Sequence, residues 1–155
     1  MSPSEIRATV RDLNSRSVAG EEAAWLKLQD LGVKVVPYLR EAYSAFSRWQ
    51  GRASLVFHSI RYARVSEDAF QLGLEALNDR ATVVRYRACA LVAYSLRTDE
   101  LFALKKLLTH TDPKTVEDAK AAMNAVRKQN HHFFQDRDES GKVHWLVNAE
   151  DRASA

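Results

Sequence analysis

Apolar residues recur at steps of three and four positions through most of the chain. The clearest stretch is 77–108, where two apolar stripes are separated by a polar break at 97–99. Each stripe lies along one side of an α-helix, and that side must pack against a neighbour to leave water. Two adjacent stripes of this kind predict a stack of helical pairs, an α-solenoid. The stripes consist of Val84, Ala88, Leu91, Val92 and Ser95, and of Leu101, Leu104, Leu107 and Leu108.

Helix start and stop signals divide residues 1–129 into further segments of this kind. Pro37 fits a helix that begins just before it, because the first N–H groups of a helix have no intrahelical partner. Glycine and proline are scarce, and neither occurs between Gly73 and Thr111, which favours long helices. The start signals are Ser2-Pro3, Gly20-Glu21-Glu22, Ser66 and Asp112-Pro113, and Gly32 is a stop signal. We therefore predict an all-α fold of about seven to eight helices.

Two of the three tryptophans fall on predicted apolar stripes. Trp25 belongs to the helix that begins near Gly20, and Trp49 belongs to a helix over residues 47–63. We expect both rings to lie in the core. In the second helix the stripe consists of Trp49, Ala53, Val56, Ile60 and Ala63, while Arg48, Arg52, His58 and Arg61 fall on other faces.

The spacing of apolar residues changes from the helical period after Gln129. Residues 130–148 alternate as two short strands around a turn at 137–141, which predicts a C-terminal β-hairpin. An isolated hairpin is marginal in water, so we expect the side that carries Trp145 to dock on the last helices. The prediction is one domain over residues 1–148, with the hairpin at 130–148 and a flexible tail at 149–155.

Composition limits the setting and the chemistry. The net charge of +3 and pI of about 9.1 are weaker than expected for a dedicated nucleic-acid binder. The single cysteine, Cys89, cannot form an internal disulfide and is read as a small buried hydrophobe. The charged N-terminus is no signal peptide, and no run approaches the roughly 20 apolar residues of a membrane span. We expect a cytoplasmic protein without membrane contact.

Three stretches resemble HEAT repeats. Residues 31–39 are similar to the hinge and second-helix start of such a repeat, and 79–88 to its first helix. Residues 112–119 look like a third, partial copy, which begins 33 residues after Asp79. The resemblance implies that Arg85 bridges to a neighbouring aspartate. The third copy lacks this arginine, and the predicted hairpin is no part of the HEAT pattern.

Small HEAT-like proteins with a C-terminal hairpin are similar to some immunity proteins of bacterial contact-dependent and polymorphic toxin systems. That resemblance rests on size and fold and on the lack of catalytic motifs, and no motif of this chain carries it. It implies a non-enzymatic protein that binds and neutralises one cognate toxin domain, without a cofactor. Blocking a toxin in this way requires a complementary interface and no chemistry.

Candidate metal sites are weak. Residues 136–141 resemble the start of a calcium loop, but its twelfth position is Val147 where a bidentate glutamate is needed, so a polar turn is preferred. His131 and His132 point to opposite faces of a strand and cannot both join His144, so we read them as surface or partner-contacting residues. We predict neither a metal nor a catalytic site, because nucleophile and phosphate-binding motifs are missing.

Two binding surfaces remain as alternatives. Short solenoids bind through the second helices of their pairs, and the predicted row there is Tyr38, Glu41, Gln71, Glu75 and Lys105. Its mixed charge suits a protein partner. The alternative is a nucleic-acid surface formed by Arg48, Arg52, Arg61, Arg64 and Arg87, which equally fit a solvated ridge. Some HEAT-like proteins are DNA glycosylases that use aromatic residues, but Trp25 and Trp49 are predicted to be buried. A generic scaffold subunit is the third alternative.

Overall fold

The computed structural model describes residues 1–142 and 145–154, and over these residues every regular element is a helix. The prediction of an all-α fold is confirmed. The α-helices are α1 (Pro3–Arg11), α2 (Val18–Leu28), α3 (Val36–Tyr43), α4 (Trp49–Ser59), α5 (Glu67–Ala76), α6 (Thr82–Ser95), α7 (Leu101–Lys105), α8 (Pro113–Arg127) and α9 (Asp151–Ser154). Short 3-10 turns are η1 (Asp12–Asn14), η2 (Gln29–Val35), η3 (Ile60–Tyr62), η4 (Lys106–Thr109) and η5 (His131–Phe134).

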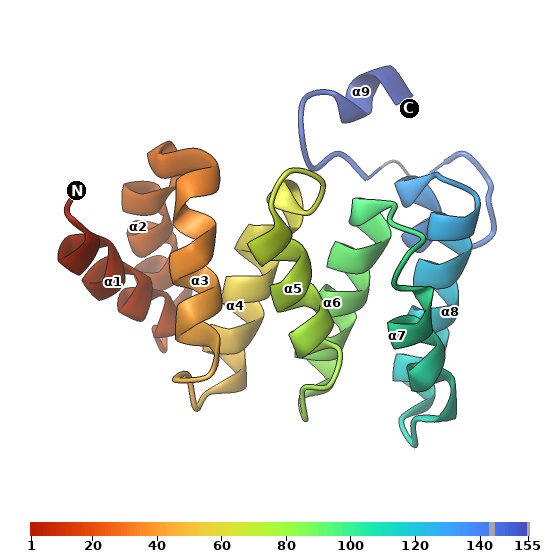
Figure 1. Cartoon of the computed structure of the whole chain (residues 1–155), viewed down its shortest axis with the longest axis horizontal. Coiled ribbons are helices and arrows are strands. Elements are labelled where there is room, and N and C mark those ends of the chain that lie inside the picture. The colour runs from red at the N-terminus through yellow and green to blue at the C-terminus, as the bar shows by residue number, and fades with distance from the viewer. Residues whose placement is uncertain (143–144, 155) are drawn as a thin grey trace.

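The helices follow one another along a single elongated array in chain order (Figure 1). Helices α3, α5 and α7 form the front layer in that view, and α4, α6 and α8 lie behind them. Helix α6 packs against α4, α5 and α8, so it is the centre of the array. The C-terminal segment returns from α8 across the upper ends of the middle helices and finishes in α9 (Figure 1).

The predicted helix starts at Ser2, Ser66 and Asp112 correspond to real caps, whereas α2 begins at Val18 with Ser17 as its cap and not near Gly20. The side chains of Ser66 and Asp112 accept backbone N–H groups at the starts of α5 and α8. Pro37 lies in the first turn of α3, which begins at Val36, as expected. Gly32 has a φ of 60°, which ends the turn before α3 in a conformation that favours glycine.

The apolar stripes meet in one core. Val84, Ala88 and Leu91 on α6 are fully buried, and so is Leu104 on α7. Cys89 is also fully buried, which confirms it as a core residue, and burial raises the pKa of its thiol. Because α6 is covered from three directions, its buried surface extends far beyond the predicted stripe and includes the whole ring of Tyr94.

Two arginine–aspartate pairs connect successive helical pairs, and the Arg52–Asp79 pair is buried on both sides. Arg52 on α4 donates from Nε to Asp79 Oδ2 at 2.8 Å and from Nη2 to Asp79 Oδ1 at 3.1 Å. Arg85 on α6 donates from Nη2 to Asp112 Oδ2 at 2.9 Å. In both pairs the aspartate stands 27 residues after the arginine. The expected bridge from Arg85 to a neighbouring aspartate is confirmed, and Arg52 forms an equivalent bridge one helical pair earlier.

Each bridge joins the starts of two neighbouring helices. The Nη1 group of Arg85 donates to the Asp79 carbonyl at 2.8 Å, so Asp79 meets one arginine through its side chain and the other through its backbone. Asp79 Oδ2 also accepts from the Tyr43 hydroxyl at 2.5 Å. Burial opposes ionisation of Asp79, but hydrogen bonds from Arg52 and Tyr43 outweigh it and lower the pKa of this carboxyl.

The predicted C-terminal β-hairpin is wrong. No strand occurs in the parts of 130–148 that the structure describes; residues 143 and 144 lie outside them. Asn130 instead accepts the backbone N–H of His132 and starts the 3-10 turn η5, whose Phe134 is buried. The backbone N–H of Trp145 donates to the His132 side chain at 2.9 Å, so a ring nitrogen takes the place of a strand partner. The polar turn is present, because Asp136 accepts the N–H groups of Ser140 and Gly141.

We predict that Asp79→Asn destabilises the fold by about 3 kcal/mol, because it leaves the Arg52 charge buried without its counter-ion. The side chains of Arg52 and Asp79 are only 6% and 3% exposed. Urea unfolding monitored by circular dichroism measures the change. The control is Glu41→Gln, which removes an exposed ion pair with Arg7 and should leave the midpoint nearly unchanged. Equal effects of both variants would contradict the proposed role of the bridge.

Candidate binding site

The predicted binding row lies on the front layer of the array. Tyr38 and Glu41 belong to α3, Gln71 and Glu75 to α5, and Lys105 to α7. Helices α3 and α5 pack side by side, so four of the five side chains share one surface. Glu41, Glu75 and Lys105 are exposed, whereas Tyr38 and Gln71 are half-buried. Use of this row in binding stays a prediction.

Ion pairs cross the front layer from helix to helix. Glu41 pairs with Arg7 of α1 at 3.1 Å, and Glu75 pairs with Arg40 of α3 at 3.0 Å. Arg40 also meets Asp68 at 2.9 Å. These arginines are therefore neutralised by carboxylates on the same surface, which gives the front layer an alternating charge that is poorly suited to a polyanion.

The arginines of the alternative nucleic-acid surface are used largely inside the fold. Arg48 donates to the carbonyls of Asn14 and Ser15, and Arg87 donates to the Ala53 carbonyl. Arg52 is buried in the bridge to Asp79, and Arg64 donates to the Tyr94 carbonyl. Only the guanidinium of Arg61 has no hydrogen bond or ion pair among the described residues. These five side chains do not form a continuous cationic track.

The tryptophan predictions need correction. Trp49 was expected in the core but is 43% exposed. It is the first residue of α4 and stands at the rim of a hollow that it shares with Val83, because the helix begins two residues later than predicted. Trp25 is half-buried and stacks on His58 with a centroid distance of 3.9 Å. Arg52 and His58, expected on other faces, are both buried.

The histidine prediction is also wrong. His131 and His132 were read as surface or partner-contacting residues, yet they are 3% and 4% exposed. The 3-10 turn η5 directs both rings inward, which a strand would not do. His144 lies outside the described residues. Among residues 1–142 and 145–154, no group of three or more histidine, cysteine, aspartate or glutamate side chains has an arrangement that could hold a metal ion.

An aromatic pocket of about 400 Å³ lies between α2, the end of α4 and the returning C-terminal segment. Its walls come from three parts of the chain that are far apart in sequence, so no local motif predicts it. Phe57 and Leu146 form its most exposed edges, and both are at least half exposed. The lining residues are Trp25, Phe57, His58, Ile60, Arg61, Trp145, Leu146 and Val147.

A polar cluster fixes the aromatic floor of the pocket. His58 Nε2 donates to Glu21 Oε1 at 2.5 Å, and the Ser54 hydroxyl donates to the same oxygen at 2.7 Å. Burial lowers the pKa of His58, although Glu21 acts in the opposite direction. Burial opposes ionisation of Glu21, but hydrogen bonds from Ser54 and His58 outweigh it and lower that pKa. Ser54 donates to the carboxylate and not to the imidazole, so the cluster orients Trp25 and provides no activated nucleophile.

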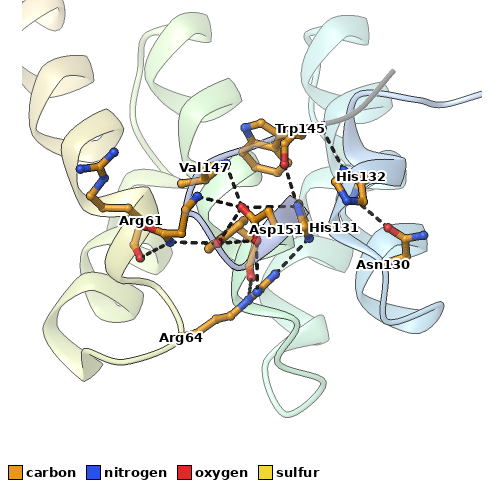
Figure 2. Close-up of polar contacts among 10 residues, drawn as sticks. Arg61, Arg64, Asn130, His131, His132, Trp145, Val147 and Asp151 are labelled. Carbon is orange, nitrogen blue, oxygen red and sulfur yellow. Dashed lines mark hydrogen bonds and ion pairs between the residues drawn. The ribbon is translucent and has the colours of Figure 1, made fainter. Parts of the chain in front are cut away.

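The C-terminal segment is held in place by Asp151. This carboxylate accepts the Tyr94 hydroxyl at 2.9 and 3.0 Å, and the backbone N–H groups of Val147 and Asn148 at 2.8 and 2.9 Å. The Asn148 amide donates to the Arg61 carbonyl at 2.9 Å (Figure 2). Asp151 falls within the predicted tail 149–155, yet its side chain is only 1% exposed. It connects the end of the chain to the centre of the array.

Two histidines hold the pocket wall at Trp145. His131 Nε2 donates to the Trp145 carbonyl at 2.8 Å, and its Nδ1 accepts from Arg64 at 3.1 Å (Figure 2). His132 Nδ1 accepts the Trp145 N–H. An accepting ring nitrogen carries no proton, so these contacts require His131 in its neutral form. Burial lowers the pKa of His131, and the nearby charge of Arg64 lowers it further, although the Trp145 carbonyl and Asp151 act in the opposite direction.

Comparison with known proteins identifies no relative: no protein-family model matches the chain, and no curated protein matches its sequence. No helix in the described part of the chain is long and apolar enough to cross a membrane.

Acidification should weaken the fold through His131. Its folded pKa lies below the ordinary value of about 6.5, so the unfolded chain takes up a proton first as pH falls. Below about pH 6.5 the unfolded state therefore binds more protons than the folded state, and the free energy of unfolding falls as the pH is lowered further. Above about pH 6.5 this histidine causes no loss of stability. We predict that His131→Gln loses less unfolding free energy than the wild type between pH 7.5 and 5.5. Urea titrations at both pH values measure this, and equal losses would contradict it.

Proposed function

We propose that the chain is a non-enzymatic protein-binding module, and more specifically an immunity protein that binds and neutralises one cognate toxin domain in the cytoplasm. The observation that supports it best is a group of large apolar side chains on adjacent helices, Trp49 and Phe57 of α4 and Val83 of α6, which are 43%, 52% and 38% exposed. Together with Arg87 we call them the outer face. Exposed apolar groups that gather on one surface are typical of protein interaction sites.

The outer face has two parts, one at the starts of α4 and α6 and one near the end of α4. Trp49 and Val83 line one hollow of about 590 Å³ at the starts of the two helices. Phe57 lies eight residues further along α4, about 12 Å away along the helix axis. Arg87 reaches from α6 to the Ala53 carbonyl and lies 4.9 Å from the centre of the Phe57 ring. Tryptophan and arginine are enriched among residues that dominate binding energy at protein interfaces, which supports a protein partner.

The repeat architecture also favours a binding protein. Arg52 and Arg85 stand 33 residues apart, as do their partners Asp79 and Asp112, which supports the proposed HEAT-like repeat. Repeats of this kind present extended surfaces to partners. The resemblance to immunity proteins rested partly on a C-terminal hairpin, so that part of its support is lost. The immunity proposal now rests on the helical array and the outer face.

The nucleic-acid alternative has less support than the protein-binding proposal. Arg48, Arg52, Arg64 and Arg87 are all held by carbonyls or carboxylates of the chain itself. A nucleic-acid surface needs cations that are free to replace the counter-ions of several phosphates. A generic scaffold subunit would also use a protein-binding face, and the fate of the bound partner separates it from an immunity protein.

The proposal is tested by capturing the partner with the tagged wild-type chain and then measuring affinity for variants. We predict that Phe57→Ala weakens binding by at least about 30-fold, because it removes an exposed aromatic anchor. The matched control is Phe102→Ala on α7, where a phenylalanine that is 69% exposed, against 52% for Phe57, lies on the front layer. Restored growth of cells that produce the captured protein together with this chain supports neutralisation. Unimpeded toxicity would contradict the immunity proposal, even if binding is tight.

The predicted row offers a competing location. Reversing its charges with Glu75→Lys and Lys105→Glu tests that row without touching the core, because both side chains are exposed. We expect the double variant to bind within about threefold of the wild type, since exposed ion pairs contribute little. The same affinity measurement checks this. If the double variant loses much of its affinity for the partner while Phe57→Ala loses none, the interface lies on the front layer.

A further inference from the structure

The aromatic pocket combines an apolar interior with one free positive charge. Its interior is formed by the rings of Trp25 and Trp145 with the aliphatic side chains of Ile60 and Val147. The volume of about 400 Å³ lies at the lower end of the range of roughly 300–1,000 Å³ for ligand pockets. A cavity of that size suits one large side chain and its neighbours better than an extended ligand.

The charge at the rim is cationic. The Arg61 guanidinium is exposed and has no hydrogen bond or ion pair among the described residues. No carboxylate is among the described lining residues of the pocket, and Oε1 of Glu21, which bonds to His58 in that lining, already accepts from Ser54 and His58. Arg87 lies over the Phe57 ring at the opposite edge. An occupant with a carboxylate beside its apolar group would thus be attracted to the rim, whereas a cationic one would be repelled.

The pocket and the front layer of the array differ in whether their arginines are paired with carboxylates. On the front layer Arg40 is matched by both Asp68 and Glu75, and Arg97 by both Glu67 and Asp99. An acidic segment therefore finds free positive charge at the pocket and carboxylates on the front layer. This difference gives the partner one preferred orientation.

A peptide fits the pocket better than a nucleotide does. One face of the Trp25 ring is already covered by His58, with an interplanar angle of 13°, so a base could not be sandwiched there. Neighbouring Arg64 and Arg87 are held in place by the Tyr94 and Ala53 carbonyls, so of these three arginines only Arg61 has a guanidinium without a hydrogen bond among the described residues. Recognition of a nucleic-acid strand needs a cationic groove that follows several phosphates.

We propose that the aromatic pocket binds an aromatic side chain flanked by carboxylates, within an acidic segment of the partner protein. The ring enters between Trp25, Trp145 and Phe57, and a neighbouring carboxylate of the segment pairs with Arg61. The position of Trp145, fixed by His131 and His132, makes the pocket available before the partner arrives. This inference rests on the proposed function, which it deepens by naming the partner chemistry.

The pocket can be tested without knowing the partner. The probe is the capped peptide acetyl-Asp-Phe-Asp-amide, followed by nuclear magnetic resonance of the indole N–H signals. We expect saturable shifts at Trp25 and Trp145, with Trp49 as an internal reference outside the pocket. Acetyl-Lys-Phe-Lys-amide should bind at least tenfold more weakly, and acetyl-Asp-Ala-Asp-amide should cause no saturable shift. Equal binding of acidic and basic peptides, or shifts confined to Trp49, would overturn the proposal.

A variant pair isolates the charge. Arg61→Gln should weaken the acidic peptide by about fivefold, the upper range for an exposed ion pair. The matched control is Arg127→Gln at the exposed end of α8, which should leave the affinity unchanged.

Tighter binding of a thymidine dinucleotide than of the acidic peptide, seen at the same indole signals, would show a nucleotide site in place of a peptide site. If the acidic peptide binds but the tagged chain captures no protein, the pocket proposal is supported and only the proposed function is rejected.

Discussion

The buried arginine–aspartate bridge is the interaction on which this array depends. Arg52 and Arg85 lie in the first turns of α4 and α6, and each is paired with the aspartate that precedes the next helix of the rear layer, α6 or α8. A buried charge without its partner is costly, so the bridge allows one spacing between successive helical pairs. Burial of the apolar stripes drives the helices to pack, and the bridges set the register in which the helices pack.

The array leaves two surfaces with different chemistry. The front layer compensates its arginines with carboxylates, whereas the outer face retains exposed aromatic and aliphatic groups beside cations. The C-terminal segment adds to this difference, because Asp151 and two neutral histidines hold it as the third wall of the aromatic pocket. A single central residue, Tyr94, contacts that carboxylate from inside α6, so the pocket wall is connected to the core.

The sequence predicted the helical stack because its stripes and caps are local. As caps, Ser66 and Asp112 accept backbone N–H groups three and two residues ahead, and Pro37 lies within the first turn of its own helix. The stripe of α6 follows from the helical period of its apolar residues. The sequence also contains the spacing of 33 residues between Arg52 and Arg85. Because Arg85 was expected to bridge to an aspartate, this spacing predicts that Arg52 does the same and is buried.

The hairpin prediction failed because alternating residues were read as strands, although histidine side chains and Asp151 satisfy the backbone there. The pocket joins Trp25, Phe57 and Trp145, whose proximity depends on the whole fold.

Hydrogen–deuterium exchange of the chain with and without its captured partner tests the location of the interface most directly. Binding at the outer face and the aromatic pocket predicts new protection in peptides that cover residues 49–61 and 145–152, with little change in α3, α5 and α7. Protection confined to those front-layer helices, with unchanged exchange at 49–61, would contradict it.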